Sequence, residues 1–107
     1  LSLEYEYLFV SKTLEVDKIM SKQKRKKVCE YDLEKMEIFA EEGAYQLDDF
    51  KNLKTVEKDY TSREKDKDIW IMLIHQGKDI ERLRLEPSEQ LINAFRNQYP
   101  RKTFKKM

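Results

Sequence analysis

The sequence predicts a mainly β fold, in which a bent antiparallel sheet or barrel of about seven strands is closed by one C-terminal helix. Three observations support this prediction. Residues 69–74 form an unbroken apolar run that is rich in β-branched and aromatic side chains. After a turn around Gly77, residues 81–85 alternate leucine with arginine, which is typical of a second strand in a hairpin. A short amphipathic stretch at about 88–98 then predicts the closing helix.

Composition limits what the chain can be. At 107 residues, with 40% charged and 11% aromatic residues, it suits one small domain (1–107) with a modest core rather than a disordered segment. The net charge of +1 gives no overall attraction to nucleic acid. The single cysteine, Cys29, cannot form an internal disulfide and suits a reducing compartment. The sequence contains no transmembrane run or signal peptide.

The first half of the chain predicts four strands, because polar and apolar side chains alternate in each of them. In the first strand, aromatic and apolar residues share one face and two glutamates share the other. We expect a bulge near the end of the second strand and a loop or strand end in the basic run that follows it. The four predicted strands are 3–9, 14–20, 27–31 and 35–40, with turns at 10–13 and at Leu33.

The second half predicts three more strands and the helix. Around Gly43 the alternation stops, so we expect an irregular connection at 41–52 with a short helical piece. Residues 55–60 form a weaker, highly charged strand, which favours an edge position. A polar hairpin loop at 61–67 is expected to lead into the hairpin described above. Ser88 is in a suitable position to cap the helix, and the basic tail at 100–107 follows the helix.

Two segments carry a resemblance to a known family. A basic segment leads into Val-Cys-Glu-Tyr-Asp-Leu-Glu-Lys-Met-Glu-Ile at 28–38, and Leu-Glu-Pro at 85–87 precedes the helix. With the order of elements, these segments resemble the bacterial branch of the pleckstrin-homology-like fold over nearly the whole chain. The start of the chain is also similar to an uncharacterised family of small bacterial membrane proteins, in which two membrane spans run into a Leu-Glu-Tyr-Glu-Tyr strand, as at 3–7.

The second resemblance implies a location. The chain begins at Leu1 rather than Met, and a strand follows almost at once, so we expect it to be part of a longer protein. If a membrane anchor precedes Leu1, the domain lies on the cytoplasmic face of the membrane. Without an anchor, we expect a cytoplasmic domain.

The best candidate site is a group of five cations that lie within six positions. Several cations on one loop would attract phosphates or anionic lipid headgroups, with about 1 kcal/mol from each cation near an anionic membrane. A solvated loop that aids solubility is the alternative. The resemblance does not supply a lipid site, because phosphoinositide-binding members carry their basic motif between the first two strands, where this chain has only Lys12. The candidate residues are Lys22, Lys24, Arg25, Lys26 and Lys27.

The C-terminal tail is a second basic segment. It could extend the positive face, but domain ends are usually poorly ordered, so we expect a frayed, solvated tail. Phe104 is the apolar exception there and is expected to fold back onto the sheet or to contact a partner. The cations of the tail are Arg101, Lys102, Lys105 and Lys106.

No catalytic, metal or cofactor motif is recognisable. His75 is the only histidine, and it lacks a zinc-binding partner at suitable spacing. Cys29 on a strand is more typical of a buried apolar residue than of a nucleophile. Asp48 and Asp49 lack the ligand spacing of a calcium loop. Trp70 is expected in the core. We therefore expect no enzyme activity, no metal and no cofactor.

Two classes of function remain. The first is a non-enzymatic interaction or scaffold domain of a membrane-anchored protein, which binds a protein partner or a second copy through a strand edge, with an anionic membrane surface as a further contact. The second is a soluble module that binds nucleic acid or anionic lipid through the basic loop at 22–27. The small net charge disfavours nucleic acid, whose binding depends steeply on salt.

Overall fold

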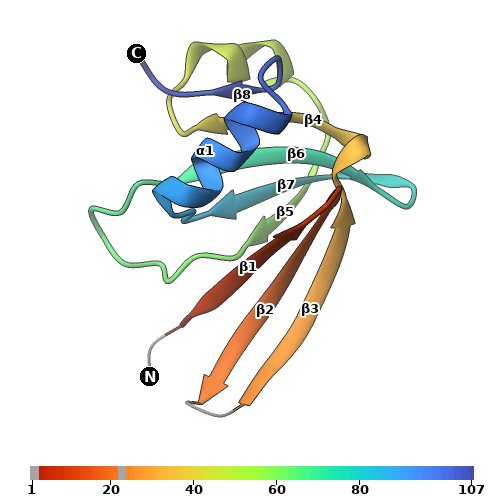
Figure 1. Cartoon of the computed structure of the whole chain (residues 1–107). Coiled ribbons are helices and arrows are strands. Elements are labelled where there is room, and N and C mark those ends of the chain that lie inside the picture. Colours follow the sequence, from red (N-terminus) through yellow and green to blue (C-terminus); the bar gives the residue numbers. More distant parts are fainter. Residues whose placement is uncertain (1–2, 22–23) are drawn as a thin grey trace.

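The computed structural model describes residues 3–21 and 24–107, which form two β-sheets and one α-helix (Figure 1). The first sheet is antiparallel, with the order β1-β2-β3. Its three neighbouring strands come from consecutive segments of the chain. The strands are β1 (Tyr5–Val10), β2 (Thr13–Ser21) and β3 (Lys24–Asp32).

The second sheet has the order β5-β7-β6-β4-β8. A 3-10 turn, η1 (Leu33–Lys35), leads from β3 into its first strand, and a second 3-10 segment, η2 (Tyr45–Phe50), lies between β4 and β5. The helix α1 (Glu89–Gln98) follows β7. The strands of this sheet are β4 (Met36–Glu41), β5 (Val56–Asp59), β6 (Trp70–Gln76), β7 (Asp79–Leu85) and β8 (Thr103–Phe104).

The main core lies between the two sheets and α1. The inner face of the first sheet contributes Leu14 and Val16, both fully buried. The ring of Phe95 on α1 lies 4.7 Å from the ring of Phe9 and 4.7 Å from that of Phe39. One helical side chain therefore joins both sheets, which explains how a single helix closes this end of the core.

Strand β6 is buried on both faces, because a second apolar cluster lies beneath η2 on the far side of its sheet. This double burial explains the unbroken apolar run in the sequence. Trp70 is 2% exposed, so its predicted core position is confirmed. The predicted helix is also confirmed, since the Ser88 side chain accepts a hydrogen bond from the backbone N of Leu91 at 3.1 Å.

Three parts of the predicted topology are wrong. The sheet is not closed into a barrel, because two separate sheets are present in the described residues. The pairing is not antiparallel throughout, since β5 pairs with β7 and β4 pairs with β8 in parallel. The segment at 61–67 is not a hairpin loop, because β5 pairs with β7 and not with β6. Placing β5 at the edge of its sheet was correct.

The prediction of a frayed, solvated C-terminal tail is wrong at residues 102–104, although Arg101 and residues 105–107 are exposed as expected. Thr103 and Phe104 form β8 beside β4, and Phe39 N donates to Lys102 O at 2.8 Å. The Lys102 ammonium donates to Met36 O at 2.6 Å, and the ring of Phe104 packs on the second cluster. This strand could not be predicted from the sequence, because it is only two residues long and shows no alternating pattern. Its expected contact, Phe104 folding back onto the sheet, is confirmed.

Candidate functional site

The two sheets are joined by a network of tyrosine side chains. Tyr31 on β3 donates its hydroxyl hydrogen to Oε1 of Glu81 on β7 at 2.6 Å. Its hydroxyl lies 2.7 Å from that of Tyr60, which must donate, because the hydrogen of Tyr31 is already used. Burial, followed by the bond to Glu81, raises the pKa of Tyr31, and burial also raises the pKa of Tyr60. Both phenols are therefore neutral donors at physiological pH.

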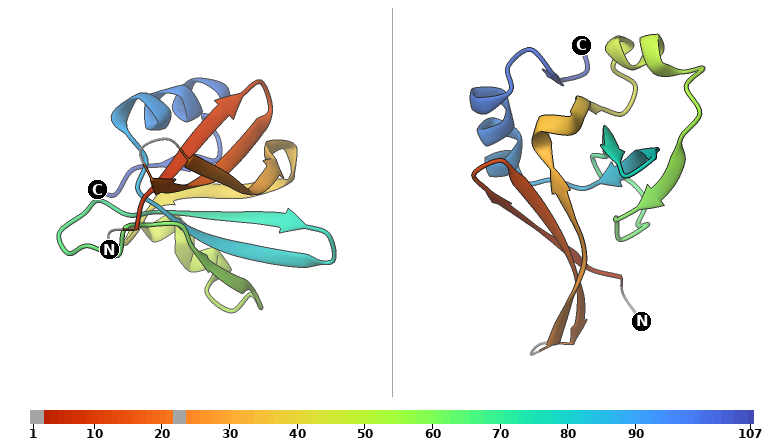
Figure 2. Two further views of the ribbon diagram at one scale, coloured as in Figure 1. Left: turned by 90° about the horizontal axis from the view of Figure 1, so that it is seen from below. Right: turned by 90° about the vertical axis from the view of Figure 1, so that its right-hand side faces the viewer.

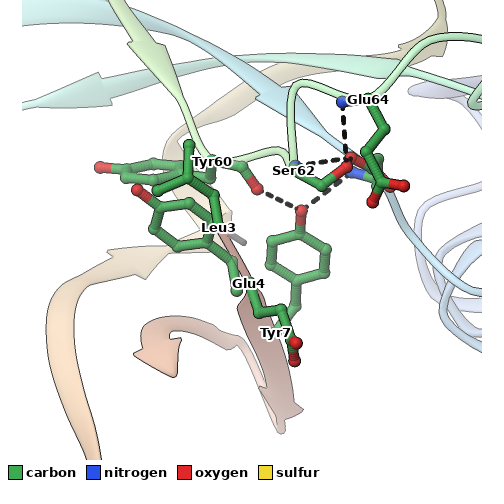
Figure 3. Close-up of a pocket in the computed structure, with 8 residues that line it drawn as sticks. Leu3, Glu4, Tyr7, Tyr60, Ser62 and Glu64 are labelled. Carbon is green, nitrogen blue, oxygen red and sulfur yellow. Dashed lines mark hydrogen bonds between the residues drawn. The ribbon is translucent and has the colours of Figure 1, made fainter. Parts of the chain in front are cut away.

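A third tyrosine extends this connection to β1. The Tyr7 hydroxyl donates to Tyr60 O at 2.6 Å and accepts from Glu86 N at 2.9 Å (Figure 3). Burial raises the pKa of Tyr7 to about 12. Glu86 is held in place in turn, because its Oε1 accepts from both the backbone N and the hydroxyl of Ser62 at 2.7 Å. The side chain of Tyr7 thus connects β1 both to the segment after β5, at Tyr60, and to the segment after β7, at Glu86.

Beside this network is a cavity of about 280 Å³. It lies between the beginning of β1 and the loop that follows β5, and Figure 3 shows the hydroxyl of Tyr7 pointing toward that loop. The rings of Tyr5 and Tyr60 meet edge to face there, with centroids 5.6 Å apart. The β1 side is formed by Leu3, Glu4, Tyr5 and Tyr7, and the opposite side by Tyr60, Ser62, Glu64 and Glu86.

Among the described strands, β1 pairs only with β2, so its edge next to the cavity is open. Ile19 N donates to Glu4 O at 2.9 Å, so the backbone of Glu4 points toward β2. By the alternation of an antiparallel ladder, the backbone groups of Tyr5, Tyr7 and Phe9 point the other way. Within residues 3–21 and 24–107, no hydrogen bond reaches these outward groups. The edge therefore presents backbone donors and acceptors beside a cavity.

The structure divides the predicted basic site. Lys22 lies outside the described residues, and the other four cations belong to β3 rather than to a loop. Arg25 makes two hydrogen bonds to the Glu6 carboxylate, at 2.7 and 3.1 Å. Lys27 lies 2.8 Å from Glu30, whose hydrogen bond raises the lysine pKa, and 3.7 Å from Glu15. These two cations are therefore neutralised by carboxylates of their own sheet.

The remaining basic residues do not form one surface. Among the described side chains, Lys24 and Lys26 have no ion-pair partner within 4.0 Å, and both are exposed. The hairpin that carries them projects away from the rest of the molecule (Figure 2), at the end opposite the C-terminus (Figure 1). The tail cations therefore do not join it. Of these, Arg101, Lys105 and Lys106 are exposed and Lys102 is half-buried.

Other residues from the sequence analysis occupy ordinary positions. His75 Nε2 lies 3.0 Å from Glu37 Oε2 at the surface, and Cys29 is half-buried with its sulfur 3.5 Å from Gln76 Nε2. In the described part of the chain, no group of three His, Cys, Asp or Glu side chains is placed to hold a metal. No helix within the described ranges is long and apolar enough to cross a membrane.

The tyrosine network and the cavity are absent from the features predicted from the sequence. One signal was present: Glu81 falls in phase with Leu83 and Leu85, which face the core, so its carboxylate had to be buried or the strand had to deviate. The structure buries it, at 9% exposure. The partners Tyr31 and Tyr60 could not be identified, because Tyr31 on β3 and Tyr60 just after β5 are far from Glu81 in the sequence.

Comparison with known proteins identifies the family. Residues 1–105 match the model of the family described as Bacterial PH-like domain (DUF6106). No curated protein and no solved structure matches the chain.

Proposed function

The chain belongs to the bacterial PH-like domain family, and we propose that it is a non-enzymatic interaction module that binds an extended segment of a partner protein along β1. One observation carries the proposal: the outward backbone groups of Tyr5 and Tyr7 have no partner in the described residues, and a cavity lies beside them. An open edge is a template for an added strand, which gains affinity from backbone hydrogen bonds and specificity from side-chain pockets.

The other open edge of this sheet is less suitable. Strand β3 begins with four consecutive cations, and lysine on an edge strand discourages pairing with another chain. Strand β1 has aromatic residues at alternate positions, which favour cross-strand contacts. At its far end the ring of Phe9 packs against Phe95 on α1, whereas the cavity lies beside its first residues. We therefore place the added segment along residues 3–7, which lead into β1 and form its first half.

A displayed library of linear peptides tests this proposal. We expect selected peptides to protect the amides of Tyr5 and Tyr7 from hydrogen exchange. Replacing Tyr5 with Pro removes its outward N–H at the first position of β1, where proline is tolerated at an edge. The matched control is Tyr5→Ala, which loses the same ring and keeps the N–H. Binding that is weaker in the Pro variant than in the Ala variant supports strand addition. Equal binding in both variants, or peptides that protect only α1, would contradict it.

A second candidate function rests on the tip of the β2–β3 hairpin. Met20 is 59% exposed there, between Lys18 and the exposed Lys24 and Lys26. An apolar side chain among lysines suits an anionic membrane surface, such as the cytoplasmic face of a membrane to which the protein is anchored. Sedimentation with phosphatidylserine-containing vesicles tests this, and Lys24→Glu with Lys26→Glu should abolish binding. Equal binding to vesicles of phosphatidylcholine alone would contradict it.

A further inference from the structure

The cavity beside β1 is lined by groups that favour a positive charge. Two kinds of group contribute: the rings of Tyr5, Tyr7 and Tyr60, and carboxylates from Glu64 and Glu86 with Glu4 alongside. Among the eight described lining residues there is no lysine, arginine or histidine. Aromatic faces attract cations through their quadrupole, and carboxylates form charge-assisted hydrogen bonds with them. An anionic ligand would be repelled at the same place.

The carboxylates differ in how far they are already used. Both hydrogen bonds from Ser62 go to Oε1 of Glu86, which fixes that side chain at the wall of the cavity. The side chain of Glu64 is exposed, and no hydrogen bond or ion pair links it to another described side chain. The hydroxyl of Tyr7 is occupied on both sides. Glu64, Glu4 and the second oxygen of Glu86 are therefore the carboxylate acceptors available to a ligand.

The size and position of the cavity restrict its occupant. A volume of about 280 Å³ accommodates a single side chain rather than a helix or a folded surface. In a segment paired with β1, alternate side chains lie on the same sheet face as the rings of Tyr5 and Tyr7. A lysine or arginine suits this geometry, because its aliphatic stem packs on apolar surface, here Leu3 and the tyrosine rings, while its charged head reaches polar groups.

We infer that the partner segment bound along β1 is basic, and that one of its lysine or arginine side chains enters the cavity toward Glu64 and Glu86. This inference rests on the proposed strand addition. It assigns the partner a charge opposite to the one expected for a lipid headgroup. It also identifies the residue within the bound segment that determines specificity.

Blocked hexapeptides of alternating threonine and valine, with one central residue varied, are the probes. That residue is lysine, arginine, glutamate or norleucine, which keeps the length of the lysine stem without its charge. Titration into the ¹⁵N-labelled chain gives the affinity and the amides that shift. We expect the norleucine peptide to bind about tenfold more weakly than the lysine peptide, because it lacks the interactions of the cation with rings and carboxylates. The glutamate peptide should bind more weakly still.

Two variants of the protein test whether the effect of the peptide's charge on affinity arises in the cavity. Glu64→Gln should weaken the lysine peptide several-fold and leave the norleucine peptide unchanged. Asp49→Asn, at an exposed carboxylate on η2 far along the chain, is the matched control and should change neither affinity.

Each outcome decides a different claim. If norleucine and lysine peptides bind equally and both shift Tyr5 and Tyr7, strand addition stands and the basic partner is ruled out. If no peptide shifts these amides at millimolar concentration, the proposed function fails and the inference fails with it. If the chain alone forms a dimer that protects the same amides, a second copy occupies the edge and the basic peptide is ruled out.

Discussion

The hydroxyl of Tyr31 on β3 lies 2.6 Å from Oε1 of Glu81 on β7 and donates a hydrogen bond to it. The tyrosine is fully buried and the carboxylate is 9% exposed. The two residues are 50 positions apart and belong to different sheets. This bond therefore connects the sheets where no backbone ladder joins them, and it satisfies a carboxylate that would otherwise be costly to bury.

Removing the donor should destabilise the fold. Tyr31→Phe leaves the buried Glu81 without its hydrogen bond, and we expect the free energy of unfolding to fall by about 1–3 kcal/mol or more. Urea denaturation measures the change. Tyr45→Phe is the control, because Tyr45 is 65% exposed. The double change Tyr31→Phe with Glu81→Leu should cost less than the sum of the single changes, since neither polar group then remains. Additive losses would show that the two residues do not act as a pair.

Tyr7 should make stability depend on alkaline pH. Its pKa is raised from 10.0 to about 12 in the folded chain, so the folded state keeps the hydroxyl proton after the unfolded state has lost it. The stabilisation is complete below pH 10 and is lost as the pH rises toward 12. Tyr7→Phe removes this titration, so its stability should decline less steeply over this interval, although it starts lower at pH 7 for want of two hydrogen bonds. Parallel pH profiles for both proteins would refute this assignment.

Asp17, on the outer face of the first sheet, should lower the free energy of unfolding at neutral pH. It is 4% exposed and its Oδ1 has no hydrogen-bond partner among the described residues. A hydrogen bond with Asp17 is the main cause that raises the pKa of Glu15, so the folded state holds a proton that the unfolded state releases. This contribution to stability is present below the ordinary glutamate pKa of 4.5 and is lost as the pH rises through the raised value.

Asp17→Asn therefore should raise the free energy of unfolding at pH 7, and the gain should shrink as the pH falls toward 4.5. Urea unfolding at several pH values gives both quantities, with Asp49→Asn as a control that should show neither. A loss of stability at pH 7 would mean that the carboxylate is satisfied by the ammonium of Lys27, its register partner on β3, and would contradict this interpretation.

The C-terminal strand should contribute measurably to stability. Deleting residues 101–107 removes the backbone bond from Phe39 N to Lys102 O, the bond from Lys102 Nζ to Met36 O, and the packing of Phe104. Each lost hydrogen bond is worth roughly 0.5–1.5 kcal/mol, so we expect a clear fall in the urea midpoint. Deleting Met107 alone, which is 100% exposed, is the control. Equal urea midpoints for the two deletions would mean that residues 101–106 contribute nothing to stability, as expected for a solvated tail.

Much of the fold follows from local patterns, because burial of one face imposes a period on the sequence. The alternation in β1 and β7, the apolar run of β6 and the Ser88 cap of α1 all identify elements that the structure contains. The likeness of 28–38 and 85–87 to bacterial pleckstrin-homology-like domains agrees with the family match over residues 1–105. None of these patterns indicates which strands pair with one another in the sheets.

The candidate site was less predictable for the same reason. The run of cations at 24–27 indicated a positive surface, yet Glu6 and Glu15 from the other two strands of the sheet lie against Arg25 and Lys27. The cavity combines residues 3–7, 60–64 and Glu86, which are not adjacent in the sequence. Electrostatic character at a surface depends on which charges the fold brings within a few ångströms, and a linear count of charges does not report this.

The sequence by itself determined the mainly β class of the fold, the approximate positions of β1 to β7 and α1, and the family to which the chain belongs. Periodicity and capping act over a few residues, so they can be recognised without a structure. Only the tertiary structure decided the parallel pairing of β5 with β7, the ordering of β8, the burial of Glu81 and the open edge of β1. These features depend on contacts between segments that are far apart in the chain, where packing and burial override local preference.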